Sequence, residues 1–111
     1  MSIYLDWNAS APIAPEVVET MTEVYRKQTG NADSRTHAYG EAARAVVECA
    51  RKEAAALLGV TPAEVFFTSG ATESSNIAIQ GLASHAEKSG KRHIITSAIE
   101  HKAVLETVKA M

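Results

Sequence analysis

The stretch that most constrains the fold runs from Phe66 to Gly81 and reads FFTSGATESSNIAIQG. Its apolar start predicts a strand, Gly70 and the hydroxyl residues predict a turn, and the remainder has helical spacing. A turn of this kind leaves backbone N–H groups free at the positive end of a helix dipole, where an anion is stabilised. The stretch therefore predicts a phosphate-binding turn, although its pattern alone equally allows an ordinary strand-to-helix connection with a hydroxyl cap.

The rest of the chain continues this alternation of strands and helices. Helices are predicted from Pro15 to the Gly30 region, from Glu41 to Gly59, from the phosphate turn to about Ala86, and from His101 onward, with one short turn at Thr61–Glu64. Apolar or extended segments are predicted at 3–5, 65–68 and 93–96. Because strands alternate with helices and are apolar, the sequence predicts an α/β fold with a mostly parallel sheet and flanking helices.

Composition narrows the class of protein. The chain has 111 residues, of which 46% are hydrophobic and 22% charged, as in a soluble globular domain. A formal net charge of −2 and the absence of a basic block argue against nucleic-acid binding. No apolar run reaches membrane-spanning length, and the N-terminus lacks the pattern of a secretory leader. We therefore expect a cytoplasmic protein with no membrane association, in which the one cysteine, Cys49, is a buried helix residue.

His101 is the second candidate site residue. It lies in SAIEHKAV, at the start of a predicted helix that follows the strand at 93–96. In open parallel sheets, ligands bind at the carboxyl edge of the strands, which is where this histidine is expected. A histidine there can stack on a planar ring and transfer a proton near neutral pH. Spacing alone also allows an exposed histidine at a helix start.

Four segments together resemble the N-terminal part of a cysteine desulfurase of the class V aminotransferase family. They are YLDWNASAP near the start, GNADSRTHAYG in the first long loop, EVFFTSGATESSNIAIQG, and HIITSAIEHKAVLET near the end. The resemblance covers nearly the whole chain. One departure is Ala32, which stands where the family usually has proline after Gly-Asn, so we expect a looser loop.

The resemblance implies an incomplete PLP-dependent transferase fold of type I. It assigns residues 1–14 to the small domain and 15–111 to the first part of the large, cofactor-binding domain. It implies that the cofactor is pyridoxal 5′-phosphate, that Ala71 and Thr72 bind its phosphate, and that His101 is a catalytic residue that stacks on its ring and takes part in proton transfer. It places Asn8 and the loop from Asn31 to His37 near the active site or the dimer interface.

The implied activity is removal of sulfur from L-cysteine to give alanine and an enzyme persulfide for iron–sulfur cluster assembly or other sulfur transfer. The implied partners are L-cysteine, a second copy in a homodimer, and a sulfur-acceptor or scaffold protein. In the family, the lysine that holds the cofactor and the nucleophilic cysteine lie downstream of the matched segment, so 111 residues alone are expected to be inactive. The alternatives are a truncated, non-catalytic chain that binds a phosphate compound or a partner, and another class V member such as a selenocysteine lyase.

Overall fold

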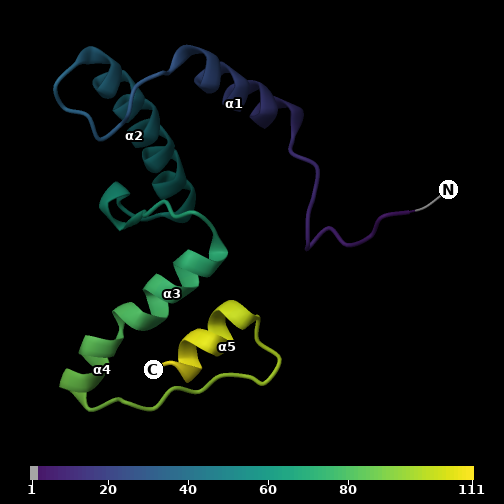
Figure 1. Cartoon of the computed structure of the whole chain (residues 1–111), viewed down its shortest axis with the longest axis vertical. Coiled ribbons are helices and arrows are strands. Elements are labelled where there is room, and N and C mark those ends of the chain that lie inside the picture. Colours follow the sequence, from purple (N-terminus) through teal and green to yellow (C-terminus); the bar gives the residue numbers. More distant parts are fainter. Residues whose placement is uncertain (1–2) are drawn as a thin grey trace. The chain divides into compact units, whose positions relative to one another are not determined.

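The computed structural model describes residues 3–111. Its helices, in chain order, are α1 (Pro15–Lys27), α2 (Ala38–Leu58), the short 3-10 helix η1 (Pro62–Glu64), α3 (Ala71–Gly81), α4 (Ala83–Ser89) and α5 (Lys102–Lys109) (Figure 1). The chain divides into two compact units, residues 1–65 and 66–111. Each unit is described by itself.

The parallel sheet is the part of the prediction that the structure does not confirm. The described residues contain no strand, and the segments 65–68 and 93–96 are irregular chain. A strand is stable only when its backbone N–H and C=O groups pair with a neighbouring strand. No described segment supplies such a neighbour to either segment. Phe66 and Ile95, which a sheet would cover, are 80% and 87% exposed.

The predicted helices are confirmed, with changes at their ends and one division: the helix predicted from the phosphate turn to about Ala86 is two helices, α3 and α4, that meet at Leu82. Helix α1 begins at Pro15, as expected for a proline in the first helical turn. Helix α2 ends at Leu58, and its C-cap residue, Gly59, adopts the left-handed conformation with φ 68° and ψ 30°. It begins three residues earlier than predicted, because the Nδ1 atom of His37 accepts a hydrogen bond from the backbone N–H of Gly40 and caps it.

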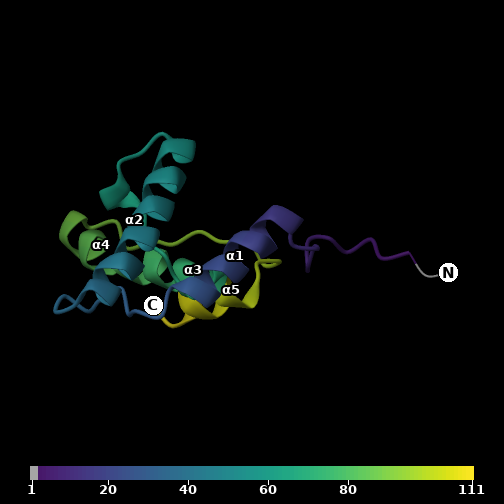
Figure 2. The ribbon, with the colours of Figure 1, turned by 90° about the horizontal axis from the view of Figure 1, so that it is seen from above.

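The first unit contains α1, α2 and η1 after the irregular stretch 3–14, which Figure 2 draws without a helix. Asp6 caps a turn there, because its carboxylate accepts a hydrogen bond from the backbone N–H of Ala9. Helix η1 packs against α2, and Arg51 of α2 donates to the carbonyl of Val65. Glu64 accepts hydrogen bonds from both the backbone N–H and the hydroxyl of Thr61, which fixes this turn.

The apolar core of the described residues is small. Ala43 and Ala55 are the buried hydrophobic residues, and larger side chains such as Leu57 remain exposed. Cys49, predicted to be buried, is exposed, because no described helix covers its side of α2. Most of the surface that would stabilise these helices is therefore not buried within the described residues.

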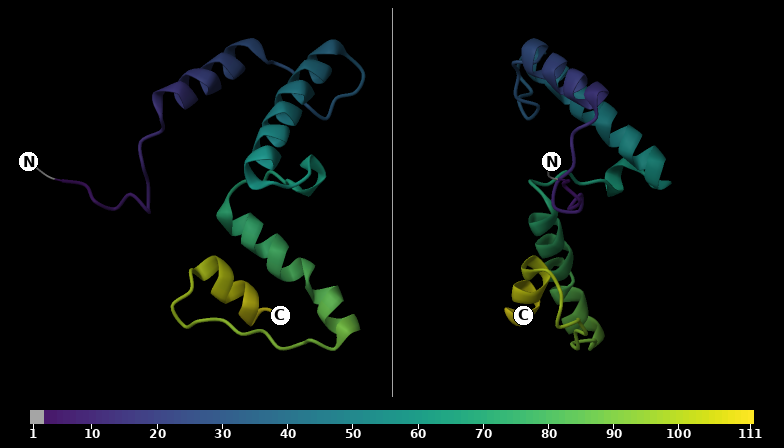
Figure 3. Two further views of the ribbon diagram at one scale, coloured as in Figure 1. Left: turned by 180° about the vertical axis from the view of Figure 1, so that it is seen from behind. Right: turned by 90° about the vertical axis from the view of Figure 1, so that its right-hand side faces the viewer.

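The second unit contains α3, α4 and α5. Helix α5 lies beside α3, with which it makes the main helix–helix contact of the described residues (Figure 3). Helix α4 continues the direction of α3 after Leu82 and ends at Gly90, which is left-handed with φ 72°. The long irregular stretch after Gly90 returns the chain to the start of α5 (Figure 1). This return brings the predicted phosphate turn and the predicted catalytic histidine onto neighbouring helices.

Candidate functional site

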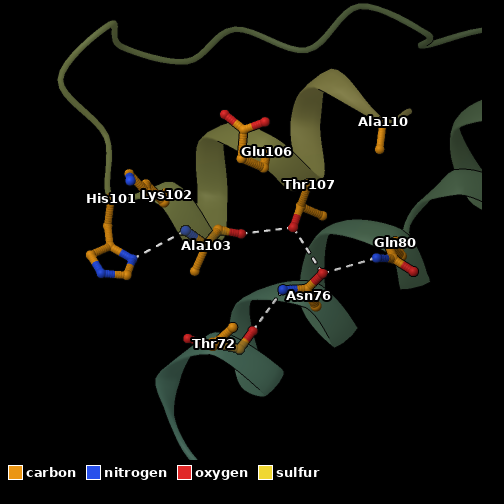
Figure 4. Close-up of a pocket in the computed structure, with 9 residues that line it drawn as sticks. All are labelled: Thr72, Asn76, Gln80, His101, Lys102, Ala103, Glu106, Thr107 and Ala110. Carbon is orange, nitrogen blue, oxygen red and sulfur yellow. Dashed lines mark hydrogen bonds between the residues drawn. The ribbon is translucent and has the colours of Figure 1, made fainter.

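An open groove of about 470 Å³ lies between helices α3 and α5 (Figure 4). Two of the three predicted site residues, Thr72 and His101, line it. Ala71, the third, is the first residue of α3 and is not among the lining residues. The groove is completed mainly by polar residues of both helices: Asn76, Gln80, Lys102, Ala103, Glu106, Thr107 and Ala110.

The turn before α3 is stabilised by hydrogen bonds between its side chains and other polar groups of the same turn. The hydroxyl of Thr68 lies 2.7 Å from that of Ser74 and 3.2 Å from the carbonyl oxygen of Gly70. The Glu73 carboxylate accepts from the backbone N–H of Ser69 at 2.5 Å. This hydrogen bond lowers the pKa of Glu73 below its ordinary value, because it stabilises the ionised carboxylate.

The residues of this turn fit a phosphate group. Within residues 3–111, the backbone N–H groups of Ala71, Thr72 and Glu73 donate to no acceptor. Gly70 has φ 157° and ψ −178°, a backbone conformation that residues with a side chain rarely adopt, and a Cβ atom there would meet no other atom. An anion can therefore approach several free donors at the positive end of the helix dipole.

The hydroxyls of Thr72 and Ser74 have different surroundings. The hydroxyl of Thr72 makes no hydrogen bond in the described part of the chain and is free to donate to a ligand in the groove. The hydroxyl of Ser74, two residues later, contacts that of Thr68 instead. The structure thus separates a hydroxyl available to a ligand from one that holds the turn.

His101 is the N-cap residue of α5. Its Nδ1 atom accepts a hydrogen bond from the backbone N–H of Ala103 at 3.1 Å. An accepting Nδ1 carries no proton, so the neutral imidazole carries its proton on Nε2. The cap therefore fixes both the position of the ring and the nitrogen that can exchange a proton. Lys102, next to it, is exposed.

Asn76 and Thr107 form a polar contact that the sequence does not indicate. The Thr107 hydroxyl lies 2.8 Å from Oδ1 of Asn76, across the two helices, and its side chain is buried (Figure 4). Gln80 and Asn76 are spaced by four residues, which is a recognisable helical pair, and their side chains are hydrogen-bonded. The partner in α5 is 31 residues away and has no such local signal.

The loop from Gly30 to Gly40 is a second polar element, in the first unit. Arg44 of α2 donates from Nε to the carbonyl of Ala32 and from Nη2 to the carbonyl of Ser34, both at 3.0 Å. A Cβ atom on Gly40 would lie 2.2 Å from the carbonyl oxygen of Ser34. Despite Ala32 in place of the expected proline, the loop backbone is therefore anchored to α2.

No helix of residues 3–111 combines the length and the apolar character that a membrane span needs. Among those residues, the structure also brings together no group of three or more His, Cys, Asp or Glu side chains that could hold a metal ion. The groove presents the His101 imidazole and the free Thr72 hydroxyl among its polar lining, and the free backbone donors lie beside it at the start of α3.

Comparison with known proteins gives the same family that the sequence segments suggest. Residues 3–111 match the family described as aminotransferase class-V. The chain is 49% identical over 113 residues to cysteine desulfurase IscS of Vibrio cholerae, and 46% identical over 111 residues to cysteine desulfurase IscS of Dechloromonas aromatica. Both comparisons cover 100% of this chain, which spans 28% and 27% of the length of these relatives.

A solved structure is also similar. The crystal structure of DndA from Streptomyces lividans matches with a TM-score of 0.76 and 48% sequence identity, over 97% of this chain and 30% of that one. The match to the family covers nearly all of the chain. The chain belongs to the aminotransferase class-V family.

Proposed function

We propose that this chain is the N-terminal part of a pyridoxal phosphate-dependent cysteine desulfurase, which converts L-cysteine to alanine and leaves the sulfur as an enzyme persulfide. The observation that carries the proposal is the groove in which Thr72 and His101 both lie, in a chain that matches cysteine desulfurases over its whole length. The groove supplies an anion-binding turn and a proton-transfer group on adjacent helices.

In this proposal Ala71 and Thr72 bind the phosphate of pyridoxal 5′-phosphate. Their free backbone N–H groups and the free Thr72 hydroxyl would donate to its oxygens at the N-terminus of α3. Glu73 does not compete for these donors, because its carboxylate is already bonded to the backbone N–H of Ser69. The phosphate would thus be held mainly by neutral donors and the helix dipole.

His101 would orient the ring of the cofactor and move a proton. Its Nδ1 atom is occupied by the cap, so Nε2 is the atom that would donate or receive the proton. When bound, pyridoxal phosphate supplies an electron sink that allows bonds next to the amino group of an amino acid to break. The proposal assigns the lysine that holds the cofactor and the nucleophilic cysteine to parts of the protein outside residues 1–111, and gives neither role to Cys49.

The remaining parts of the proposal concern the full-length protein. Residues 1–14 would belong to a small domain and residues 15–111 to the first part of the large cofactor-binding domain. The parallel sheet would form when further segments pair with residues 65–68 and 93–96. The protein would be a cytoplasmic homodimer that passes sulfur to an acceptor or scaffold protein, as in iron–sulfur cluster assembly.

The test is made on the full-length protein encoded by the gene that contains this chain. Sulfide release from L-cysteine and cofactor binding are measured for the wild type, His101→Ala and Thr72→Val. We expect His101→Ala to abolish most activity and Thr72→Val to weaken cofactor binding. His85→Ala is the matched control, because His85 is exposed on α4 and does not line the groove.

Two outcomes separate the alternatives. If L-selenocysteine but not L-cysteine is consumed, the protein is a different class V enzyme acting at the same site. If the open frame ends at Met111, or the full-length protein binds the cofactor without consuming either amino acid, the catalytic proposal is wrong and a binding function remains.

A further inference from the structure

The side chains of Asn76 and Thr107 form the one side-chain hydrogen bond that joins α3 and α5 within residues 3–111. Thr107 is 6% exposed and is the buried polar residue of the described chain, and Asn76 is half-buried. A polar contact that is shielded from water is stronger and more directional than one at the surface. The contact is therefore well placed to fix how the two helices sit against each other.

Each end of this contact continues toward a predicted site residue. The Nδ2 atom of Asn76 donates to the carbonyl oxygen of Thr72 at 2.8 Å. The hydroxyl of Thr107 also lies 2.7 Å from the carbonyl oxygen of Ala103, and the N–H of Ala103 is the one that His101 accepts. Figure 4 shows this as a connected series from Thr72, through Asn76, Thr107 and Ala103, to His101.

The side-chain polar atoms of Thr107 and Asn76 are all hydrogen-bonded. Thr107 has one hydroxyl proton between two acceptor oxygens, so the proton is shared as a three-centre hydrogen bond. Oδ1 of Asn76 also accepts from Nε2 of Gln80 at 3.0 Å. Asn76 thus has one acceptor atom and one donor atom, and both are engaged.

Apolar packing alone would leave the register of the helices less well defined. The side chains of Val104, Leu105 and Ile79 are half-buried, but apolar contact is non-directional. A shift of α5 by one turn would move His101 by about 5.4 Å along the helix axis. A buried hydrogen bond between Asn76 and Thr107 distinguishes one register from the others.

We propose that Asn76 and Thr107 are positioning residues that hold α5 in the register at which His101 faces the Thr72 turn. The inference rests on the proposed function, because it gives a role to the distance between the phosphate turn and the histidine. Neither residue needs to touch the substrate. Their effect on the reaction would pass through His101.

Thr107→Val tests the proposal in the full-length holoenzyme, because it removes the hydroxyl while keeping a similar shape. Displacement of a catalytic group by about 1 Å can lower the rate by about 100-fold. We expect kcat to fall by roughly 10- to 100-fold with KM changed by less than about 3-fold, since substrate binding is not altered. Thr107→Ser keeps the hydroxyl, and we expect it to restore kcat to within about 3-fold of the wild type.

A matched control separates this effect from the loss of a hydroxyl within a helix. The Thr22 hydroxyl donates to the carbonyl of Val18 at 2.8 Å, as Thr107 does to Ala103, but it has no hydrogen-bond partner in another of the described helices. Thr22→Val should leave kcat unchanged. Asn76→Ala gives a second route if Thr107→Val does not fold. Thr107→Val and Asn76→Ala both remove the same hydrogen bond between the helices. The variant that carries both substitutions should therefore lose no more activity than the more affected single variant.

Amide hydrogen exchange of the cofactor-free protein provides a readout that does not depend on activity. Exchange at the first turn of α5, including the N–H of Ala103, should be faster in Thr107→Val than in the wild type and Thr107→Ser. The proposal is overturned if the wild type is active and requires His101, yet Thr107→Val and Asn76→Ala keep wild-type kcat. Failure of the proposed function is seen separately, as a wild type that does not consume L-cysteine.

Discussion

Nδ1 of His101 accepts a hydrogen bond from the backbone N–H of Ala103 at 3.1 Å, so one side chain both caps α5 and presents an imidazole to the groove. These two functions can be separated by substitution. Asparagine is a good N-cap, because its Oδ1 atom can accept the same N–H, but it cannot transfer a proton as imidazole does. We therefore expect His101→Asn to keep α5 and to lose activity.

The measurement for His101→Asn has two parts, both on the full-length protein. Amide exchange at Ala103 should stay close to that of the wild type, whereas removal of a proton-transfer group should lower kcat by about 100- to 10,000-fold. His101→Ala should lose both properties. Wild-type activity in His101→Asn would show that His101 serves only as a helix cap.

The phosphate turn gives a second prediction. Gly70→Ala forces a side chain into a backbone conformation with φ 157°, at a cost of about 1–3 kcal/mol. Because the turn needs this conformation to bind the phosphate, we expect the strain to lower the affinity for pyridoxal phosphate by about 5- to 150-fold. Titration of the cofactor-free protein by visible absorbance measures it. Gly81→Ala is the control, because a Cβ atom there meets no other atom; equal affinities for the two variants would argue against the turn as the site.

The Glu73 carboxylate gives a prediction about pH. Its pKa is lowered by the hydrogen bond from the backbone N–H of Ser69, and a lowered pKa means that the ionised form stabilises the turn. The stabilisation is fully present above the pKa of the unfolded chain and is lost as the pH falls through the lower pKa of the folded turn. The chemical shift of the Ser69 N–H should follow this titration, and Glu73→Gln should remove it. A Ser69 N–H shift that does not change in acid would contradict the contact.

The loop anchored by Arg44 gives a prediction about stability. Arg44→Ala removes both hydrogen bonds to the loop carbonyls, and Gly40→Ala places a Cβ atom against the carbonyl oxygen of Ser34. We expect each to lower the free energy of unfolding of the full-length protein by about 1–3 kcal/mol. Proteolysis within residues 30–40 should become faster, while Gly81→Ala, which meets no atom, should leave it unchanged. Unaltered cleavage in Arg44→Ala would mean that the anchor does not hold the loop.

Residues 1–111 expressed alone should unfold without a sharp transition, or should associate. The buried hydrophobic residues of the described chain are Ala43 and Ala55, while Phe66, Ile95 and Ile99 are at least 80% exposed. Short helices without a packed core are marginal in water. Circular dichroism during heating, with sedimentation to measure association, tests this. A cooperative transition of a monomer would contradict it.

The sequence predicts the helices better than it predicts the sheet, and two of its candidate site residues, Thr72 and His101, line the groove. Pro15 and Gly59 set helix ends through properties of single residues, and the cap at His101 needs only a neighbour two residues away. Segments 65–68 and 93–96 carry strand propensity, but a strand also needs a partner, which local sequence does not supply. The contact between Asn76 and Thr107 depends on how two helices pack, so no local sequence pattern predicts it. The prediction that Cys49 is buried is wrong for a related reason, because the burial of a helix residue depends on which other elements cover that face of the helix.

The central claim is that the groove between α3 and α5 belongs to an enzyme that removes sulfur from L-cysteine. Its most direct test is the formation of alanine from L-cysteine by the full-length protein, with pyridoxal phosphate supplied and a thiol present to release the sulfur. We expect alanine and sulfide in equal amounts, with both reduced together in His101→Asn. Cofactor-loaded protein that forms no alanine, or forms it equally well without His101, would contradict the account.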